Sequence, residues 1–297
     1  MDTGTLGQMG AQALAYLHPF WAGAWSAIRL ASFLMAVILV FELCVPGRRL
    51  HWRTVAFNAL YMPLYLTVAM ALLYPLTVVV DPWLPKNLTG LQVSDRITPA
   101  SLAFFVLYLL CYDFFYYWFH RCQHAFGVMW RYHTLHHSDV NVSMSTSIRH
   151  HWLEESIRYF LIAAPMSVLY GGPGRIPFWM SAATGLLGLV MHWNMPWRLG
   201  ALSRWVVTPW YHRIHHSVEP RHHQKNFAVF FPFWDRLFGT QHLPAEGEFP
   251  DTGIVGLQRP NGLALLLPWP LPTMAPTEQS GVAMVADDRK GAWVGSP

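Results

Sequence analysis

The chain has 297 residues, of which 53% are hydrophobic, 15% are aromatic and only 12% are charged. Charged residues make up about a quarter of an ordinary soluble domain, so much of this chain is predicted to face lipid. The formal net charge is only +4 and no long run of Lys and Arg is present, which argues against a nucleic-acid partner. The three cysteines form no Cys-x-x-Cys pair, so neither a disulfide framework nor a structural zinc knuckle is predicted.

Three apolar stretches are predicted to form membrane helices, at residues 20–45, 55–80 and 97–119. The second contains no charged residue, and Pro63 and Pro75 are expected to kink it. No basic segment with a cleavage site precedes the first stretch, so we expect that stretch to act as the insertion signal. These stretches define a predicted transmembrane region at residues 1–119.

Basic residues predict the orientation of the bundle. Arg48, Arg49 and Arg53 cluster after the first stretch, whereas residues 1–19 carry no Lys or Arg. The positive-inside rule therefore places this loop in the cytoplasm, and two further crossings bring the chain back there at His120. We expect a multi-pass integral membrane protein with its clustered histidines on the cytoplasmic face.

Two shorter apolar stretches, at 159–170 and 176–197, flank a Gly-Gly-Pro-Gly break. They predict a helical hairpin at about 157–197 that re-enters the membrane and returns His192 to the cytoplasmic side. The resulting fold class is all-α, a multi-pass transmembrane helical bundle with a cytoplasmic helical cap. Residues 120–245 would form the catalytic region, and the Pro-rich segment 246–297 would form a surface strap and a disordered tail.

Half of the 16 histidines occur in three boxes, one His-x-x-x-His and two His-x-x-His-His. Residues three and four apart share one face of a helix, so each box presents its imidazoles to one side. Imidazole suits iron, copper, nickel and zinc, and eight helix-borne rings fit a two-metal centre in the cap. No His-Glu-x-x-His protease motif is present. The predicted ligands are His120, His124, His133, His136, His137, His212, His215 and His216.

Two acidic residues are candidates to support these ligands. Asp113 precedes His120 by seven residues and shares nearly the same helix face, so it could accept a hydrogen bond from a ligand ring or bond another helix. Glu154 follows His151 by three residues and could orient it. The histidines interpreted instead as loop or interface residues are His18, His51, His222, His223 and His242.

The boxes and their surroundings resemble the integral-membrane fatty acid hydroxylase and sterol desaturase superfamily over residues 97–242. Trp152 and Gln224 depart from its usual pattern, which more often has proline and an acidic residue there. The resembling segments are Asp113-Phe-Phe-Tyr-Tyr-Trp-Phe-His120-Arg121, Trp130-Arg-Tyr-His133-Thr-Leu-His136-His137-Ser138, Arg149-His-His151-Trp-Leu-Glu154, His192-Trp-Asn194, Lys225-Asn226-Phe-Ala-Val and Trp234-Asp235-Arg-Leu-Phe-Gly-Thr240.

The resemblance implies a centre of two iron ions, for which zinc could substitute in purified protein. It also implies O2, two electrons from an external donor such as a cytochrome, ferredoxin or reductase, and hydroxylation or desaturation of an unactivated C-H bond in a lipid, such as a sterol or fatty acyl chain. It places His151 and His192 at the metal site and suggests supporting roles for Asn226 and Asp235.

Two other functions are compatible with histidines in membrane helices. A bis-histidine haem electron carrier needs only two histidines per haem and would not require contiguous His-His pairs. A metal permease should carry its ligands near the bilayer midplane, whereas here they gather at one end of the helices.

Overall fold

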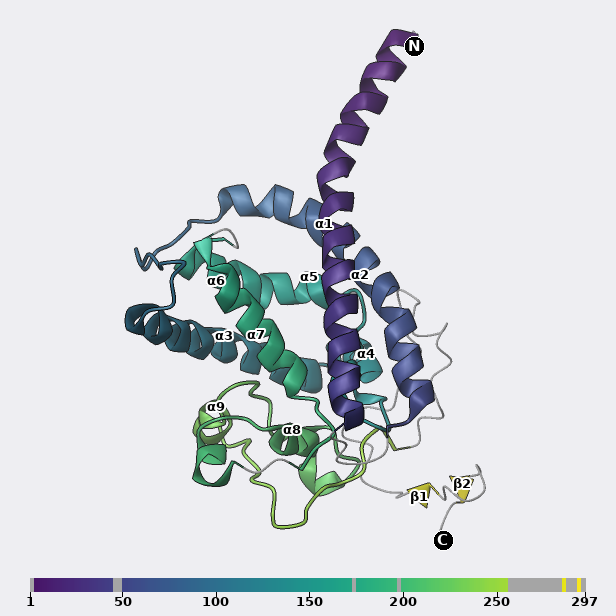
Figure 1. Cartoon of the computed structure of the whole chain (residues 1–297), viewed down its shortest axis with the longest axis vertical. Coiled ribbons are helices and arrows are strands. Elements are labelled where there is room, and N and C mark those ends of the chain that lie inside the picture. The colour runs from purple at the N-terminus through teal and green to yellow at the C-terminus, as the bar shows by residue number, and fades with distance from the viewer. Residues whose placement is uncertain are drawn as a thin grey trace.

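The computed structural model describes residues 3–44, 50–172, 175–196, 199–255, 285–286 and 293–294, and this part of the chain is mostly helical (Figure 1). Near the C-terminus two short strands, β1 (Val285–Ala286) and β2 (Trp293–Val294), pair antiparallel. Helical architecture is therefore confirmed, with this small ribbon as the exception. Most of the predicted strap and tail lies outside the described residues.

The first two predicted stretches lie within the long helices α1 (Thr3–Cys44) and α2 (Trp52–Val80), which pack against each other. Pro63 and Pro75 lie inside α2, which changes direction along its length (Figure 1). Each proline removes one backbone hydrogen bond of the helix. Exposed Phe33 and Leu60 present apolar surface outward. Arg48 and Arg49, on which the predicted orientation depends, lie outside the described residues.

The third stretch forms α3 (Pro99–Ala125), whose start follows from local sequence. Thr98 and Ser101 form a reciprocal capping box, and Pro99 occupies the first turn, where its missing N-H costs nothing. The helix continues beyond the predicted end at residue 119, so His120 and His124 lie on its last turns. Helix α4 (Gly127–His137) follows directly and packs back on α3.

Within the described residues, two helical segments are long and apolar enough to cross a membrane, Trp52–Trp83 and Pro99–Ala125. The first includes α2 and a short 3-10 turn, η1 (Asp81–Trp83). The predicted hairpin is built from shorter pieces. They are α5 (Glu154–Arg158), the π-helical turn η3 (Tyr159–Ala163), α6 (Ala164–Tyr170) and α7 (Phe178–Val190).

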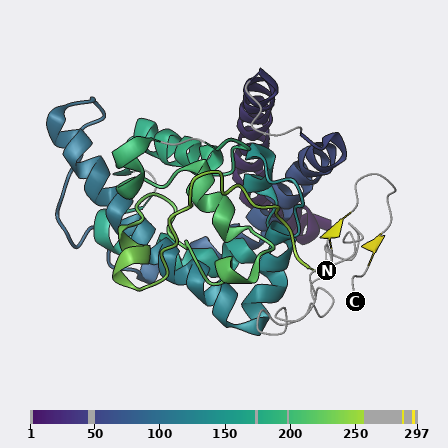
Figure 2. The same ribbon diagram turned by 90° about the horizontal axis from the view of Figure 1, so that it is seen from below.

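The remaining short elements gather at one end of the bundle, where α8 and α9 lie together in Figure 1. Seen from that end, their loops lie in front of the longer helices (Figure 2). A buried apolar cluster joins α3 to this region through Tyr117, Tyr211 and Phe227. The elements are η2 (Met144–Ile148), η5 (Gly200–Arg204), α8 (Pro209–His215), η6 (Pro220–His222) and α9 (Phe233–Leu237).

Candidate metal centre

Nine buried histidines converge in two adjacent groups, and within each group the ligand nitrogens all lie within 4.8 Å of one another. Helices α4 and α8 each contribute to both groups. The rings of His137 and His216, one from each group, stack with centroids 4.4 Å apart. The five-histidine group contains His120, His124, His133, His137 and His215, and the four-histidine group contains His136, His192, His212 and His216.

Local sequence explains how the short helix α4 contributes imidazole rings to both groups. In α4, His133 and His137 are four residues apart and therefore share a face, which is turned toward α3. His136 precedes His137 by one residue, about 100° further round the helix, so it faces the second group. The contiguous His-His pair in each His-x-x-His-His box thus divides its two rings between the groups.

Hydrogen bonds determine which nitrogen of three rings carries the proton. His120 Nδ1 lies 2.9 Å from the carbonyl of Phe227, and His215 Nδ1 lies 2.8 Å from the carbonyl of Lys225. A carbonyl oxygen only accepts, so both rings donate from Nδ1 and present a lone pair on Nε2.

His133 has the same arrangement through a carboxylate, because its Nδ1 lies 3.4 Å from Glu154 Oε2. Burial would raise the pKa of the Glu154 carboxyl, but the imidazoles of His150 and His133 hold that pKa well below its usual range. The carboxylate therefore accepts. The Nε2 lone pairs of His120 and His133 then face each other at 3.2 Å. Two facing lone pairs repel unless a cation lies between or beside them.

The four-histidine group is also prepared for a cation. His192 Nε2 lies 3.2 Å from His136 Nε2 and 3.0 Å from His212 Nε2, and its Nδ1 is 2.8 Å from Ser147 Oγ. Burial lowers the pKa of His136, His212 and His216 well below 6.5, so these rings are neutral near pH 7. Neutral, buried imidazoles are the donor type that first-row transition metals prefer, so both groups fit such ions.

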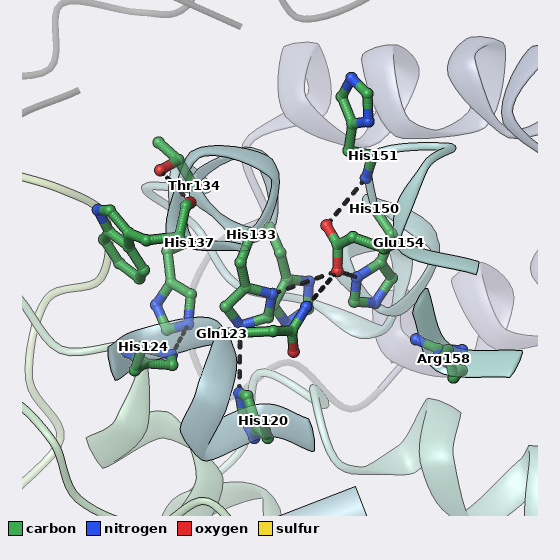
Figure 3. Close-up of polar contacts among 12 residues, drawn as sticks. His120, Gln123, His124, His133, Thr134, His137, His150, His151, Glu154 and Arg158 are labelled. Atoms are coloured by element: carbon green, nitrogen blue, oxygen red, sulfur yellow. Dashed lines mark hydrogen bonds and ion pairs between the residues drawn. The ribbon is translucent and has the colours of Figure 1, made fainter. Parts of the chain in front are cut away.

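Glu154 organises the side of the five-histidine group nearest to α5 (Figure 3). Its carboxylate accepts from Gln123 Nε2 at 2.6 Å and from His150 Nδ1 at 3.3 Å, in addition to His133. Glu154 also accepts the backbone N-H of His151 at 3.1 Å, but the imidazole rings that it orients are those of His133 and His150.

The structure does not bring His151 to either group. Its ring packs against Tyr132 and Trp152, and in Figure 3 it points away from the other labelled histidines. The preceding residue, His150, faces the centre instead and stacks on His136 with centroids 4.3 Å apart. Residues 149–153 join η2 to α5 outside any helix, so consecutive side chains point to different sides. His150 precedes Glu154 by four residues, and this spacing is the feature of the sequence that could have predicted their contact.

We expect Glu154→Gln to weaken metal retention by about 10-fold to 100-fold, because the amide cannot accept simultaneously from Gln123, His133 and His150. The measurement is the metal content of purified protein after dialysis against graded chelator. Asp95→Asn, at an exposed position, is the matched control. Equal chelator sensitivity in both variants would contradict the role assigned to Glu154.

Asp113 acts on a loop rather than on a ligand ring. Its carboxylate accepts the backbone N-H groups of Val229, Phe230 and Phe231 at 2.7, 3.1 and 2.7 Å. Of the two roles that the sequence left open, the structure shows a structural bond, made to a loop. This loop, residues 225–231, carries the two carbonyls that orient His215 and His120.

The other two supporting candidates hold the same loop. Asp235 accepts the N-H groups of Phe227 and Ala228 at 2.8 and 3.0 Å. Asn226 has a φ of 59°, and its side chain bonds the carbonyls of Tyr211 and His242 and the N-H of His242. Asparagine tolerates this left-handed conformation better than most residues. These three side chains therefore position ring-orienting carbonyls, and none lies in the histidine groups.

Residues 105–240 match the family model described as fatty acid hydroxylase. This region, which contains all nine clustered histidines and makes up somewhat less than half of the chain, is therefore similar to the fatty acid hydroxylase family. The resemblance found in the histidine boxes is thereby confirmed.

Three curated relatives show what the chain is similar to. An ornithine lipid hydroxylase of Rhizobium tropici is 34% identical over 151 residues, which are 51% of this chain and 45% of that protein. An alkylglycerol monooxygenase of Danio rerio is 32% identical over 50% of this chain and 32% of its own length. A very-long-chain aldehyde decarbonylase of Oryza sativa is 27% identical over 43% of this chain and 22% of its own length. The chain thus spans less than half the length of each relative, and no solved structure matches it significantly.

Proposed function

We propose that this protein is a membrane-bound di-iron oxygenase that hydroxylates or desaturates an unactivated C-H position of a lipid, using O2 and two electrons from an external donor. The observation that carries the proposal is the pair of Nε2 lone pairs on His120 and His133, facing each other at 3.2 Å inside a buried cluster. Such a pair favours a cation between or beside the two nitrogens, and the second group beside it supports a site for another.

The five-histidine group would hold one ion and the four-histidine group the other. When bound, the two iron ions would supply the activation of dioxygen that attack on a C-H bond requires. The chain's own contribution is to orient the rings and to exclude water. The rings of His120, His133 and His216 are completely shielded from solvent, and the Lys225 and Phe227 carbonyls fix two of the tautomers.

The same arrangement supports the lipid substrate and the membrane location that we propose. His120 and His124 lie on the last turns of α3, an apolar helix long enough to cross a bilayer, so a lipid could reach the centre without leaving apolar surroundings. Two of the three relatives described have names that denote insertion of oxygen into a lipid. Their names favour hydroxylation over desaturation.

The alternative functions fit the geometry less well. A haem carrier needs a macrocycle between two facing rings, but the facing Nε2 atoms here are separated by only 3.0–3.2 Å. A metal permease is disfavoured because both α3 histidines lie at the helix end rather than near mid-span.

Lipid mass spectrometry of host cells tests the proposal. Cells expressing the chain are grown under isotopically heavy dioxygen and compared with cells expressing His216→Ala or the exposed-site variant His51→Ala. We expect a lipid that gains one heavy oxygen with the wild type and His51→Ala only. A lipid that instead loses two hydrogens would assign desaturation. An unchanged lipid profile, in cells whose purified protein carries both metals, would overturn the oxygenase proposal.

A further inference from the structure

A second cluster of ligand-type side chains lies outside the two histidine groups. It contains His222, His242 and Glu248, and their nearest nitrogen and oxygen atoms all lie within 4.8 Å of one another. His222 Nε2 is 3.0 Å from Glu248 Oε1, and His242 Nε2 is 3.3 Å from Glu248 Oε2. Two imidazoles thus converge on one carboxylate. The proposed oxygenase chemistry uses none of these three residues.

The cluster is held in place by neighbouring groups. His222 is almost completely buried, and its Nδ1 lies 2.8 Å from Ser217 Oγ, which orients the ring so that Nε2 faces the carboxylate. The backbone N-H of Ala245 donates to Glu248 Oε2 at 2.6 Å, and the indole of Trp210 donates to the Glu248 carbonyl. Second hydrogen bonds of this kind are typical of metal-binding histidines and carboxylates.

Two histidines and one carboxylate form a recurring donor set for divalent transition ions. Zinc sites of the His₂Glu type keep a fourth position for water, and ferrous sites use two histidines and one carboxylate in the same way. An ion could enter from solvent, because an open cavity of about 450 Å³ reaches Glu248. The cavity is lined by Glu219, Arg221 and residues 245–250.

Arg221 is a described residue that opposes a cation here. Its Nη2 lies 2.8 Å from Glu248 Oε1, so it competes for the same carboxylate oxygen. The Arg221 side chain is 62% exposed and also pairs with Glu219 at 2.7 Å, so it can turn toward solvent while keeping an anionic partner. Displacing the guanidinium therefore leaves no buried charge unpaired.

We propose that His222, His242 and Glu248 bind one divalent first-row transition ion, such as Zn²⁺, separately from the histidine-rich centre. His222 and His242 flank residues 223–241, the segment that contains the carbonyls of Lys225 and Phe227. An ion bound to both histidines links the two ends of this segment. It thereby braces the loop that orients His215 and His120, and its role is structural.

The test titrates Zn²⁺ into purified full-length protein whose histidine-rich centre is already loaded with iron, and counts bound zinc by elemental analysis. We expect the wild type to bind one equivalent of zinc and to unfold at a higher temperature when it is bound. Glu248→Gln and His222→Gln are expected to lose this equivalent while retaining their iron. Loss of iron in the wild type during the titration would identify displacement at the main centre and overturn the proposal.

Arg221→Gln separates a metal site from a purely hydrogen-bonded cross-link. Removing the competing guanidinium should tighten zinc binding severalfold if the carboxylate is a ligand. A cross-link without metal would gain nothing from this change, and Arg221→Gln would then bind no more zinc than Glu248→Gln. Because Arg221 is exposed, its replacement leaves the fold intact and keeps the proposal falsifiable even if the buried-site variants are unstable.

Discussion

His216→Ala is expected to abolish product formation and to reduce bound iron from two ions per chain toward one. His216 Nε2 lies 3.2 Å from His212 Nε2 in the four-histidine group, and the ring is fully shielded from solvent. Without it only three imidazoles remain in that group. A proposed chemistry that needs two ions cannot proceed with one, so turnover should fall below detection. Iron analysis and lipid mass spectrometry of the same preparation measure the two effects.

The effect of His216→Ala on metal binding should be separable from its effect on folding. Within the described residues, the buried His216 Nδ1 has no hydrogen-bond partner, so truncating the ring breaks no Nδ1 bond. The main structural cost is a cavity, on the order of 2 kcal/mol. Thermal unfolding should therefore remain cooperative in His216→Ala. His51→Ala, at an exposed histidine, should retain both ions and full activity. Two bound ions and normal turnover in His216→Ala would refute the ligand assignment.

Asp113→Ala is expected to destabilise the protein more than His216→Ala does. The change leaves the N-H groups of Val229, Phe230 and Phe231 without their acceptor in a buried site. Each buried, unsatisfied donor costs about 1–3 kcal/mol, so the total loss is about 3–5 kcal/mol if the loop relaxes partly. The released loop would also withdraw the Phe227 carbonyl from His120.

Two comparisons distinguish this explanation from a generic loss of charge. Asp113→Asn keeps one carboxamide oxygen as an acceptor, so it should be less damaging than alanine. Asp95→Asn, at an exposed aspartate, should change neither stability nor metal content. Thermal unfolding in detergent and iron content measure both outcomes. If Asp113→Ala unfolds at the wild-type temperature and retains its metal, the loop is held by other contacts and the role given to Asp113 is wrong.

Histidine spacing predicted much of the centre because helix geometry is local. The first and last rings of a His-x-x-His-His box are four residues apart, so they share a helix face and enter the same group, while the ring between them faces the other group. All eight box histidines accordingly occur in the two groups, and His192 joins them as the resemblance implied. Apolar length likewise indicated the helices that became α2 and α3.

Histidine spacing could not decide between His150 and His151, because they lie in a non-helical connection whose side-chain directions depend on packing. Only His150 stacks on His136 and bonds Glu154 through its ring.

The amino-acid sequence by itself determined the helical content, the apolar helices and which eight box histidines would cluster, since each depends on residues close together along the chain. Tertiary structure alone decided which nitrogen of His120 is protonated and what Asp113 holds. Those properties depend on backbone carbonyls and N-H groups more than 100 residues away, such as that of Phe227 for His120 and that of Val229 for Asp113. Every residue carries the same backbone groups, so their pairing leaves no pattern in the sequence and appears only when the chain is packed.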